Sequence, residues 1–87
     1  MSDVKLIYFS WIREGVGMGE EDVTLPGNVV TVGDLIAWLK TRGEEFDHVL
    51  RHDSAIRVAI NHEHVDDRNH PLAGATEIAL FPPMTGG

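Results

Sequence analysis

The sequence contains no cysteine. This absence excludes a disulfide framework, a zinc site built from thiolates and a thiol nucleophile, and it fits a reducing compartment. Long hydrophobic runs are also missing, because no stretch approaches the ~20 apolar residues that a membrane-spanning helix needs. The first residues lack the basic and apolar regions of a secretory signal. We therefore expect a cytoplasmic protein that does not bind membranes.

Basic residues are scarce. Lys and Arg number 7 against 14 Asp and Glu, so the formal net charge is -7. This balance disfavours nucleic acids and anionic lipids as partners and favours a basic protein surface. With 87 residues, of which 43% are hydrophobic, we expect one globular domain with little room for a deep active-site cleft of its own.

Apolar and β-branched residues predict five strands. The segment Val4–Ile12 is almost entirely apolar and predicts a central strand covered on both faces. Alternation predicts the other strands at residues 22–25, 55–61, 64–65 and 77–81, the first of them forming a hairpin with the central strand. Between the two strands of this hairpin, Gly15, Gly17 and Gly19 indicate a flexible turn rather than a phosphate-binding loop, since no helix with Lys-Ser or Lys-Thr follows.

One main helix is predicted from Thr31 onward. Thr31 and Asp34 form a capping-box pattern at its start, and Gly43 is a natural residue to follow its end. Four apolar residues at helical spacing form one stripe, namely Val32, Leu35, Ile36 and Leu39. A short second helix is expected over residues 45–51. The element order predicts an α+β fold of the β-grasp (ubiquitin-like) type, in which a mixed sheet of about five strands packs on one main helix. The first and last long strands would be parallel neighbours in the middle of this sheet. Residues 1–81 would form this domain and residues 82–87 a flexible C-terminal tail.

The polar residues do not predict a catalytic or metal centre. His48 and His52 have helical spacing and His62 and His64 strand spacing, but nothing brings the two pairs together as zinc requires, so we expect surface histidines and no metal. The acidic pairs, Glu20-Glu21, Glu44-Glu45 and Asp66-Asp67, are expected to be solvated in polar turns. Ser10 and Ser54 have no evident base.

The C-terminal residues have a different character. Pro82-Pro83 prevents the last strand from continuing and stiffens the base of the tail. Gly86-Gly87 has no side chains, so it can enter a channel too narrow for larger residues. This combination predicts a semi-rigid stem with a bare carboxylate at its tip, which ATP-dependent adenylation could activate toward a sulfur or nitrogen nucleophile.

At these residues the chain resembles the family of small, sulfur-carrying subunits of molybdopterin synthase (the MoaD family). The resemblance runs along essentially the whole sequence and is strongest at His70-Pro71-Leu72 and at the segment from Glu77 to Gly87, with its Phe-Pro-Pro and terminal Gly-Gly. It implies that an activating enzyme of the ubiquitin E1 type adenylates Gly87, that a sulfur donor protein converts it to a thiocarboxylate, and that the sulfur passes to cyclic pyranopterin monophosphate.

The resemblance also implies partners and roles. The chain would bind no cofactor itself, while the activating enzyme consumes ATP. Its partner would be the large synthase subunit, in a heterotetramer, and the catalytic side chains would lie on that subunit. Gly86 would permit entry of the tail, and the partner contacts would come from Phe81, Pro82, Pro83, Met84 and Thr85. Three alternatives stay open: a sulfur carrier of another pathway, such as the thiamin type; a ubiquitin-like modifier attached to lysines through Gly87; and an interaction module that uses its acidic face.

Overall fold

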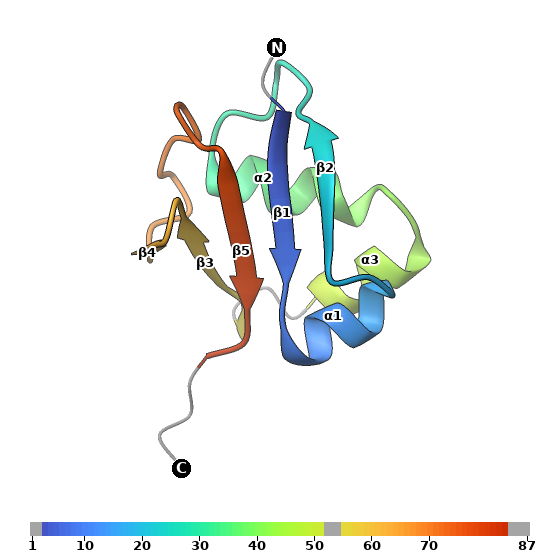
Figure 1. Ribbon diagram of the computed structural model, residues 1–87. Helices are drawn as coiled ribbons and strands as arrows, with labels where there is room; N and C mark the ends of the chain where they lie inside the picture. The colour runs from blue at the N-terminus through green and yellow to red at the C-terminus, as the bar shows by residue number, and fades with distance from the viewer. Residues whose placement is uncertain (1–2, 52–54, 84–87) are drawn as a thin grey trace.

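The computed structural model describes residues 3–51 and 55–83 (Figure 1). The strands are β1 (Asp3–Tyr8), β2 (Glu20–Thr24), β3 (Arg57–Ile60), β4 (Glu63–Val65) and β5 (Glu77–Phe81). The helices are α1 (Ser10–Val16), α2 (Val32–Lys40) and α3 (Glu44–Leu50). None of the helices in the described part of the chain is long and apolar enough to cross a membrane.

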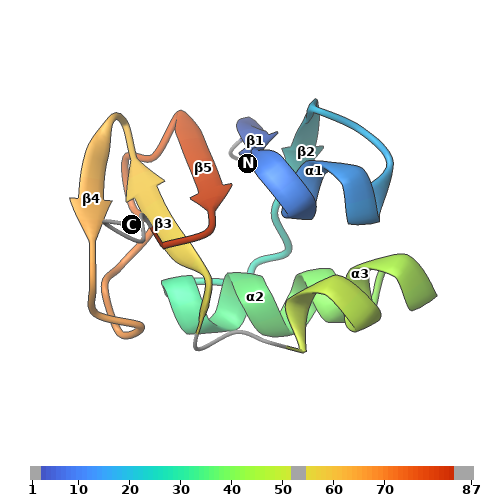
Figure 2. The same cartoon turned by 90° about the horizontal axis from the view of Figure 1, so that it is seen from below.

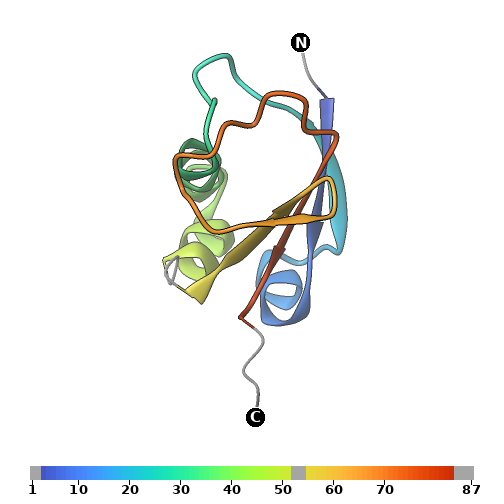
Figure 3. The same ribbon diagram turned by 90° about the vertical axis from the view of Figure 1, so that its left-hand side faces the viewer.

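The five strands form one mixed sheet in the order β2-β1-β5-β3-β4. β1 and β5 are parallel neighbours near the middle, and the other pairs are antiparallel. Figures 2 and 3 show α2 and α3 on one face of the sheet and α1 beyond the end of β1. This arrangement confirms the β-grasp prediction. α3 matches the short helix expected over residues 45–51, whereas α1 was not predicted.

The hydrophobic core lies between the sheet and α2 and α3. The four predicted apolar residues of α2 are all buried. They face inward-pointing residues of the strands, of which Leu6, Ile78 and Leu80 are fully buried. Burial of each such side chain contributes about 1.5–3 kcal/mol. Leu72 lies in the connection before β5 and is also buried.

The capping box of α2 is present as predicted. The Thr31 hydroxyl accepts from the Asp34 N–H at 3.1 Å, and the Asp34 carboxylate accepts from the N–H groups of Val30 and Thr31. The prediction for Gly43 was wrong, because α2 ends earlier. Thr41 is its C-cap, with a hydroxyl that donates to the Trp38 carbonyl at 2.6 Å, and Gly43 instead precedes the first turn of α3.

The first strand is shorter than predicted. β1 ends at Tyr8, and residues expected to continue the strand form α1. Ile12 and Val16 are four residues apart and are the buried residues of α1, so helical spacing accounts for the apolar residues that had suggested a strand. Only one face of the strand is fully covered, because buried Val4, Leu6 and Tyr8 alternate along it with the partly exposed residues Lys5 and Ile7.

The glycines after β1 have distinct structural roles and do not form one flexible turn. Gly15 lies inside α1 and against Val49 of α3, so closely that a β-carbon would overlap the valine side chain. Gly17 is the C-cap of α1 with φ 86, a left-handed conformation that favours glycine, and its N–H donates to the Arg13 carbonyl. β1 and β2 pair antiparallel as predicted, but α1 connects them instead of a tight hairpin loop.

The turn between β3 and β4 is held by the Asn61 side chain. Asn61 and His62 have positive φ values of 51 and 74 and form the turn. The predicted strands 55–61 and 64–65 had left residues 62–63 for it, so the turn lies one residue earlier than predicted. The Asn61 amide oxygen accepts from the N–H groups of Thr76 and Glu77, and its amide nitrogen donates to the Gly74 carbonyl. These bonds attach the β3–β4 turn to the segment that leads into β5.

Candidate docking site at the end of the last strand

The partner-binding residues predicted from the sequence follow directly from β5. Phe81 is the last residue of the strand, and Phe81, Pro82 and Pro83 are all partly exposed. Met84, Thr85, Gly86 and Gly87 lie outside the described residues. The described part of the predicted site is therefore the stem from Phe81 to Pro83.

An apolar groove of about 390 Å³ lies at this stem. Besides the three predicted residues, it is lined by Phe9 and Ser10 from the junction of β1 and α1. Phe9 is 48% exposed and, with Trp11 and Val30, is one of three large apolar side chains that are exposed among the described residues. The groove thus joins two segments that are separated by some seventy residues in the sequence but adjacent in space.

The backbone explains why Phe9 faces outward. Its N–H still donates to the Leu80 carbonyl at 3.1 Å, so Phe9 continues the alternation of β1 beyond buried Tyr8 and lies on the outer face of the sheet. Ser10 then takes φ 57 and turns the chain into α1. Phe81 reaches the same face because it follows buried Leu80 in β5. Phe9 was not predicted as a site residue because Val4–Ile12 was interpreted as one strand buried on both faces.

His64 extends the groove toward the edge of the sheet. Its ring lies 5.8 Å from the Phe81 ring, centroid to centroid, and its Nε2 is 3.2 Å from the Asp66 carboxylate. The surface at the end of β5 therefore combines aromatic rings from β4, from β5 and from Phe9, which lies between β1 and α1. Trp11, 39% exposed, is a further large apolar side chain near the start of α1.

The groove has the chemistry of a binding surface. Among the described residues that line the groove, Ser10 has the only side-chain hydroxyl and none is acidic, basic or cationic, while His64 and Asp66 lie beside the groove. A nucleophile without a neighbouring base is not activated for covalent catalysis. An exposed aromatic pair with rigid prolines beside it is typical of a protein contact.

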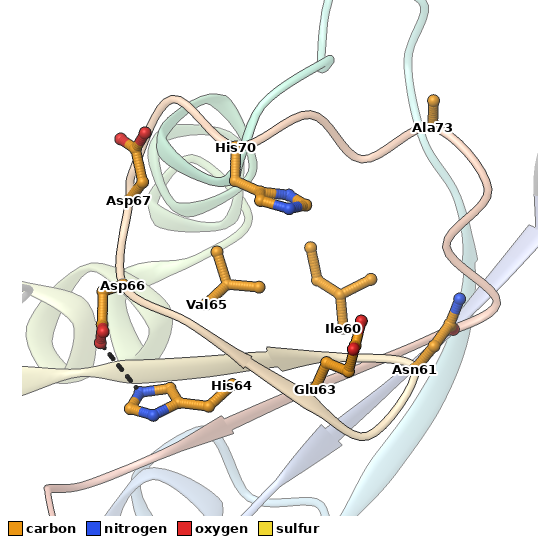
Figure 4. Close-up of a pocket in the computed structure, with 9 residues that line it drawn as sticks. All are labelled: Ile60, Asn61, Glu63, His64, Val65, Asp66, Asp67, His70 and Ala73. Carbon is orange, nitrogen blue, oxygen red and sulfur yellow. Dashed lines mark ion pairs between the residues drawn. The ribbon is translucent and has the colours of Figure 1, made fainter.

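The histidines occupy separate places on the surface. His48 is exposed on α3, His62 lies 3.4 Å from Glu77, and His64 pairs with Asp66, while His52 lies outside the described residues. Over residues 3–51 and 55–83, no group of three His, Cys, Asp or Glu side chains is placed to hold a metal ion. His64 and His70 both line a hollow beside β4, but Figure 4 shows His64 directed away from His70.

One member of the acidic pairs has a structural role that the sequence did not indicate. Glu21 lies in β2 with its side chain only 13% exposed, and its carboxylate accepts from the Tyr8 hydroxyl at 2.6 Å and from Arg42 at 2.7 Å. Burial raises the pKa of Tyr8, and the Glu21 carboxylate raises it further. The prediction of a solvated residue was therefore wrong for Glu21. Its neighbour Glu20 is exposed and pairs with Lys5 at 3.5 Å.

Comparison with known proteins identifies the family. The ThiS family model matches residues 6–87, which is nearly the whole chain. The chain belongs to the ThiS family. It is 31% identical to the molybdopterin synthase sulfur carrier subunit of Escherichia coli strain K12 over 97% of this chain and 99% of that protein. The resemblance to sulfur-carrying subunits of molybdopterin synthase, first seen in the Phe-Pro-Pro and Gly-Gly motif, is thereby confirmed.

Solved structures of this family share the fold. A Pyrococcus furiosus protein described as molybdopterin converting factor subunit 1 has a TM-score of 0.75 at 27% identity, covering 97% of this chain and all of that one. SAMP1 of Haloferax volcanii, a small archaeal modifier protein, has a TM-score of 0.71 at 25% identity, covering 99% and 100%. The same fold occurs in a complex of subunits 1 and 2 of the molybdopterin-converting factor from Helicobacter pylori, with a TM-score of 0.63 at 22% identity, covering 98% and 99%.

Proposed function

We propose that this chain is a sulfur carrier in the synthesis of molybdopterin. The observation that carries the proposal is its similarity, over nearly its full length, to the molybdopterin synthase sulfur carrier subunit of Escherichia coli. The groove at Phe9 and Phe81 supports it, because a carrier that presents a slim tail needs a docking surface where that tail leaves the domain. The five described residues that line the groove are apolar apart from Ser10, which suits a surface that contacts a partner protein.

The proposed reaction uses the carboxylate of Gly87. A carboxylate oxygen attacks the α-phosphorus of ATP on an activating enzyme of the ubiquitin E1 type, which releases pyrophosphate and leaves a glycyl adenylate. A sulfide equivalent from a donor protein attacks the carbonyl carbon and displaces AMP, which gives the thiocarboxylate. Within molybdopterin synthase the sulfur is transferred to cyclic pyranopterin monophosphate, and the carboxylate is restored by water.

The proposed partner is the large synthase subunit, with one small subunit at each end of a large-subunit dimer. The tail would enter that subunit while Phe9, Phe81 and the two prolines contact its surface. Because Pro82 and Pro83 have restricted φ and donate no N–H, they limit the directions in which the tail can leave β5. Less conformational entropy is then lost when the tail is bound.

A transfer assay tests this proposal. The full chain carrying a Gly87 thiocarboxylate, mixed with the large subunit and the pterin precursor, should form molybdopterin and return to the carboxylate form. The chain lacking Gly87 is the negative control, and Glu44→Gln, an exposed change on α3, is a control that should behave like the unmodified sequence. Molybdopterin formation by the chain lacking Gly87 would contradict the proposal.

A second candidate function is a ubiquitin-like modifier, which the similarity to the small archaeal modifier protein of Haloferax volcanii favours. In that case a lysine amine would replace sulfur as the nucleophile on the same adenylate, and an isopeptide bond at Gly87 would form. Tagged protein expressed in its own cells distinguishes the two. Covalent conjugates resistant to thiol reagents, with Gly87 joined to lysine, would support the modifier, whereas free thiocarboxylate alone would support the carrier.

A further inference from the structure

A hollow of about 490 Å³ lies beside β4, at the edge of the sheet opposite β2 (Figure 4). The side chains of Ile60 and Val65 point into it from the strands, and His70 points into it from the connection that follows β4. Ile60 is almost fully buried and Val65 packs against the core, so the floor of the hollow is apolar. Its volume is in the range of pockets that bind small molecules or side chains.

The rim of the hollow is acidic. Glu63, Asp66 and Asp67 all line it, and none of its lining residues is Lys or Arg. Arg68 follows Asp67 in the sequence, but its guanidinium donates to the Ile56 carbonyl at 2.9 Å and does not line the hollow. An apolar floor with an acidic rim complements a long cationic side chain, whose aliphatic stem prefers apolar surface while its charged end needs carboxylates.

The hollow is linked to the docking groove through His64. His64 lines the hollow, contacts Phe81 of the groove and pairs with Asp66 on the rim. β4 is an edge strand of only three residues, so a protein seated on the outer face can reach around it. The two features therefore lie on either side of one narrow strand.

We propose that this hollow binds an arginine or lysine side chain of the same protein that receives the tail, which gives docking a cationic anchor in addition to the apolar groove. The identity of that protein rests on the proposed function. The stem of the cationic side chain lies on Ile60 and Val65, and its charged group pairs with Glu63, whose carboxylate is directed toward the hollow in Figure 4. Asp66, which pairs with His64, and Asp67, which points away from the hollow, add negative charge at the rim. The anchor fixes the orientation of the domain about the tail, which the groove alone leaves free to rotate.

The first test uses the full chain and a small probe. Acetyl-arginine methylamide is titrated into labelled protein while amide chemical shifts are recorded, and acetyl-citrulline methylamide serves as the uncharged control. Saturable shifts at Ile60, Glu63 and Val65 with the arginine probe alone are expected. Chemical-shift changes of similar size at other acidic surfaces, or changes of equal size with the citrulline probe, would overturn the proposal.

The second test measures affinity for the large subunit. The triple change Glu63→Gln, Asp66→Asn and Asp67→Asn removes the acidic rim, and it should weaken binding at least about 10-fold. The control triple, Asp22→Asn, Glu44→Gln and Asp47→Asn, removes the same charge from exposed positions elsewhere and should change affinity by less than about 2-fold.

The outcomes separate the anchor from the proposed function. Equal weakening by both triples would show that only net charge matters and would overturn the anchor. If the unmodified chain does not bind the large subunit at all, the proposed function fails, while the arginine titration still decides whether the hollow takes a cationic side chain. Amide spectra of both triples verify that each is folded.

Discussion

Gly15 is the position where the contact between α1 and α3 can be tested most sharply. A β-carbon there would overlap Cγ2 of Val49, which is 6% exposed and packed in the core. Gly15→Ala therefore forces α1 and α3 apart or drives Val49 from its rotamer. Because α1 begins immediately after Phe9, the same displacement would disturb the docking groove.

The expected magnitude is the difference between two opposing terms. Overpacking of this kind costs about 1–3 kcal/mol. Alanine gains about 0.5–1 kcal/mol over glycine inside a helix. Because the overlap with Val49 is severe, the cost lies in the upper part of its range, about 2–3 kcal/mol, and the net expectation for Gly15→Ala is a loss of about 1–2.5 kcal/mol in the free energy of unfolding. Urea denaturation measures this as a lower midpoint with an unchanged slope.

Two further variants identify the cause. Gly17→Ala has open space around it, so its cost of about 1–2 kcal/mol arises from the left-handed backbone alone. Val49→Ala removes the overlapping methyl, so it should offset part of the Gly15→Ala loss in the double variant and none of the Gly17→Ala loss. The reasoning is refuted if Gly15→Ala is as stable as the unmodified chain, or if its effect simply adds to that of Val49→Ala.

Three other changes should separate docking from folding. Phe9→Ala should weaken binding to the large subunit about 10-fold or more with little change in unfolding midpoint, as calorimetric titration and urea denaturation would show; equal affinity would contradict the groove assignment. Glu21→Ala should cost about 2 kcal/mol because it leaves the Tyr8 hydroxyl without its acceptor, and an unfolding midpoint within error of the unmodified chain would refute this. Asp34 has a pKa lowered chiefly by its bond from the Val30 N–H, so its stabilisation is present above the unfolded pKa and is lost below about pH 4. Between pH 5 and 3 the unfolding midpoint should therefore fall more steeply for the unmodified chain than for Asp34→Asn, and parallel curves would be contrary evidence.

The elements with a clear periodicity could be predicted from the sequence. The α2 stripe, the capping box and the alternation of β5 each depend on interactions within a few residues, and all are present in the structure. The stem at Phe81-Pro82-Pro83 was identified by its motif. Its position at the end of a central strand could be predicted from the element order, because a crossover from β1 to β5 allows these strands to pair in parallel.

The missed features depend on tertiary contacts. Phe9 and Ile12 are apolar in either a strand or a helix, and only the φ of Ser10 and the packing of α1 on α3 decide that the strand stops. The role of Gly15 depends on Val49, which is distant in sequence. Glu21 was interpreted as one of a solvated pair because its partners, Tyr8 and Arg42, come from other elements.

The central claim is that Gly87 carries sulfur as a thiocarboxylate. Its most direct test incubates the chain with ATP, the activating enzyme and the sulfur donor, followed by intact mass measurement and fragmentation. The account predicts a gain equal to the exchange of one oxygen for sulfur, located on Gly87 and dependent on ATP. An unchanged mass with an active enzyme and donor, or sulfur located anywhere other than Gly87, would contradict it.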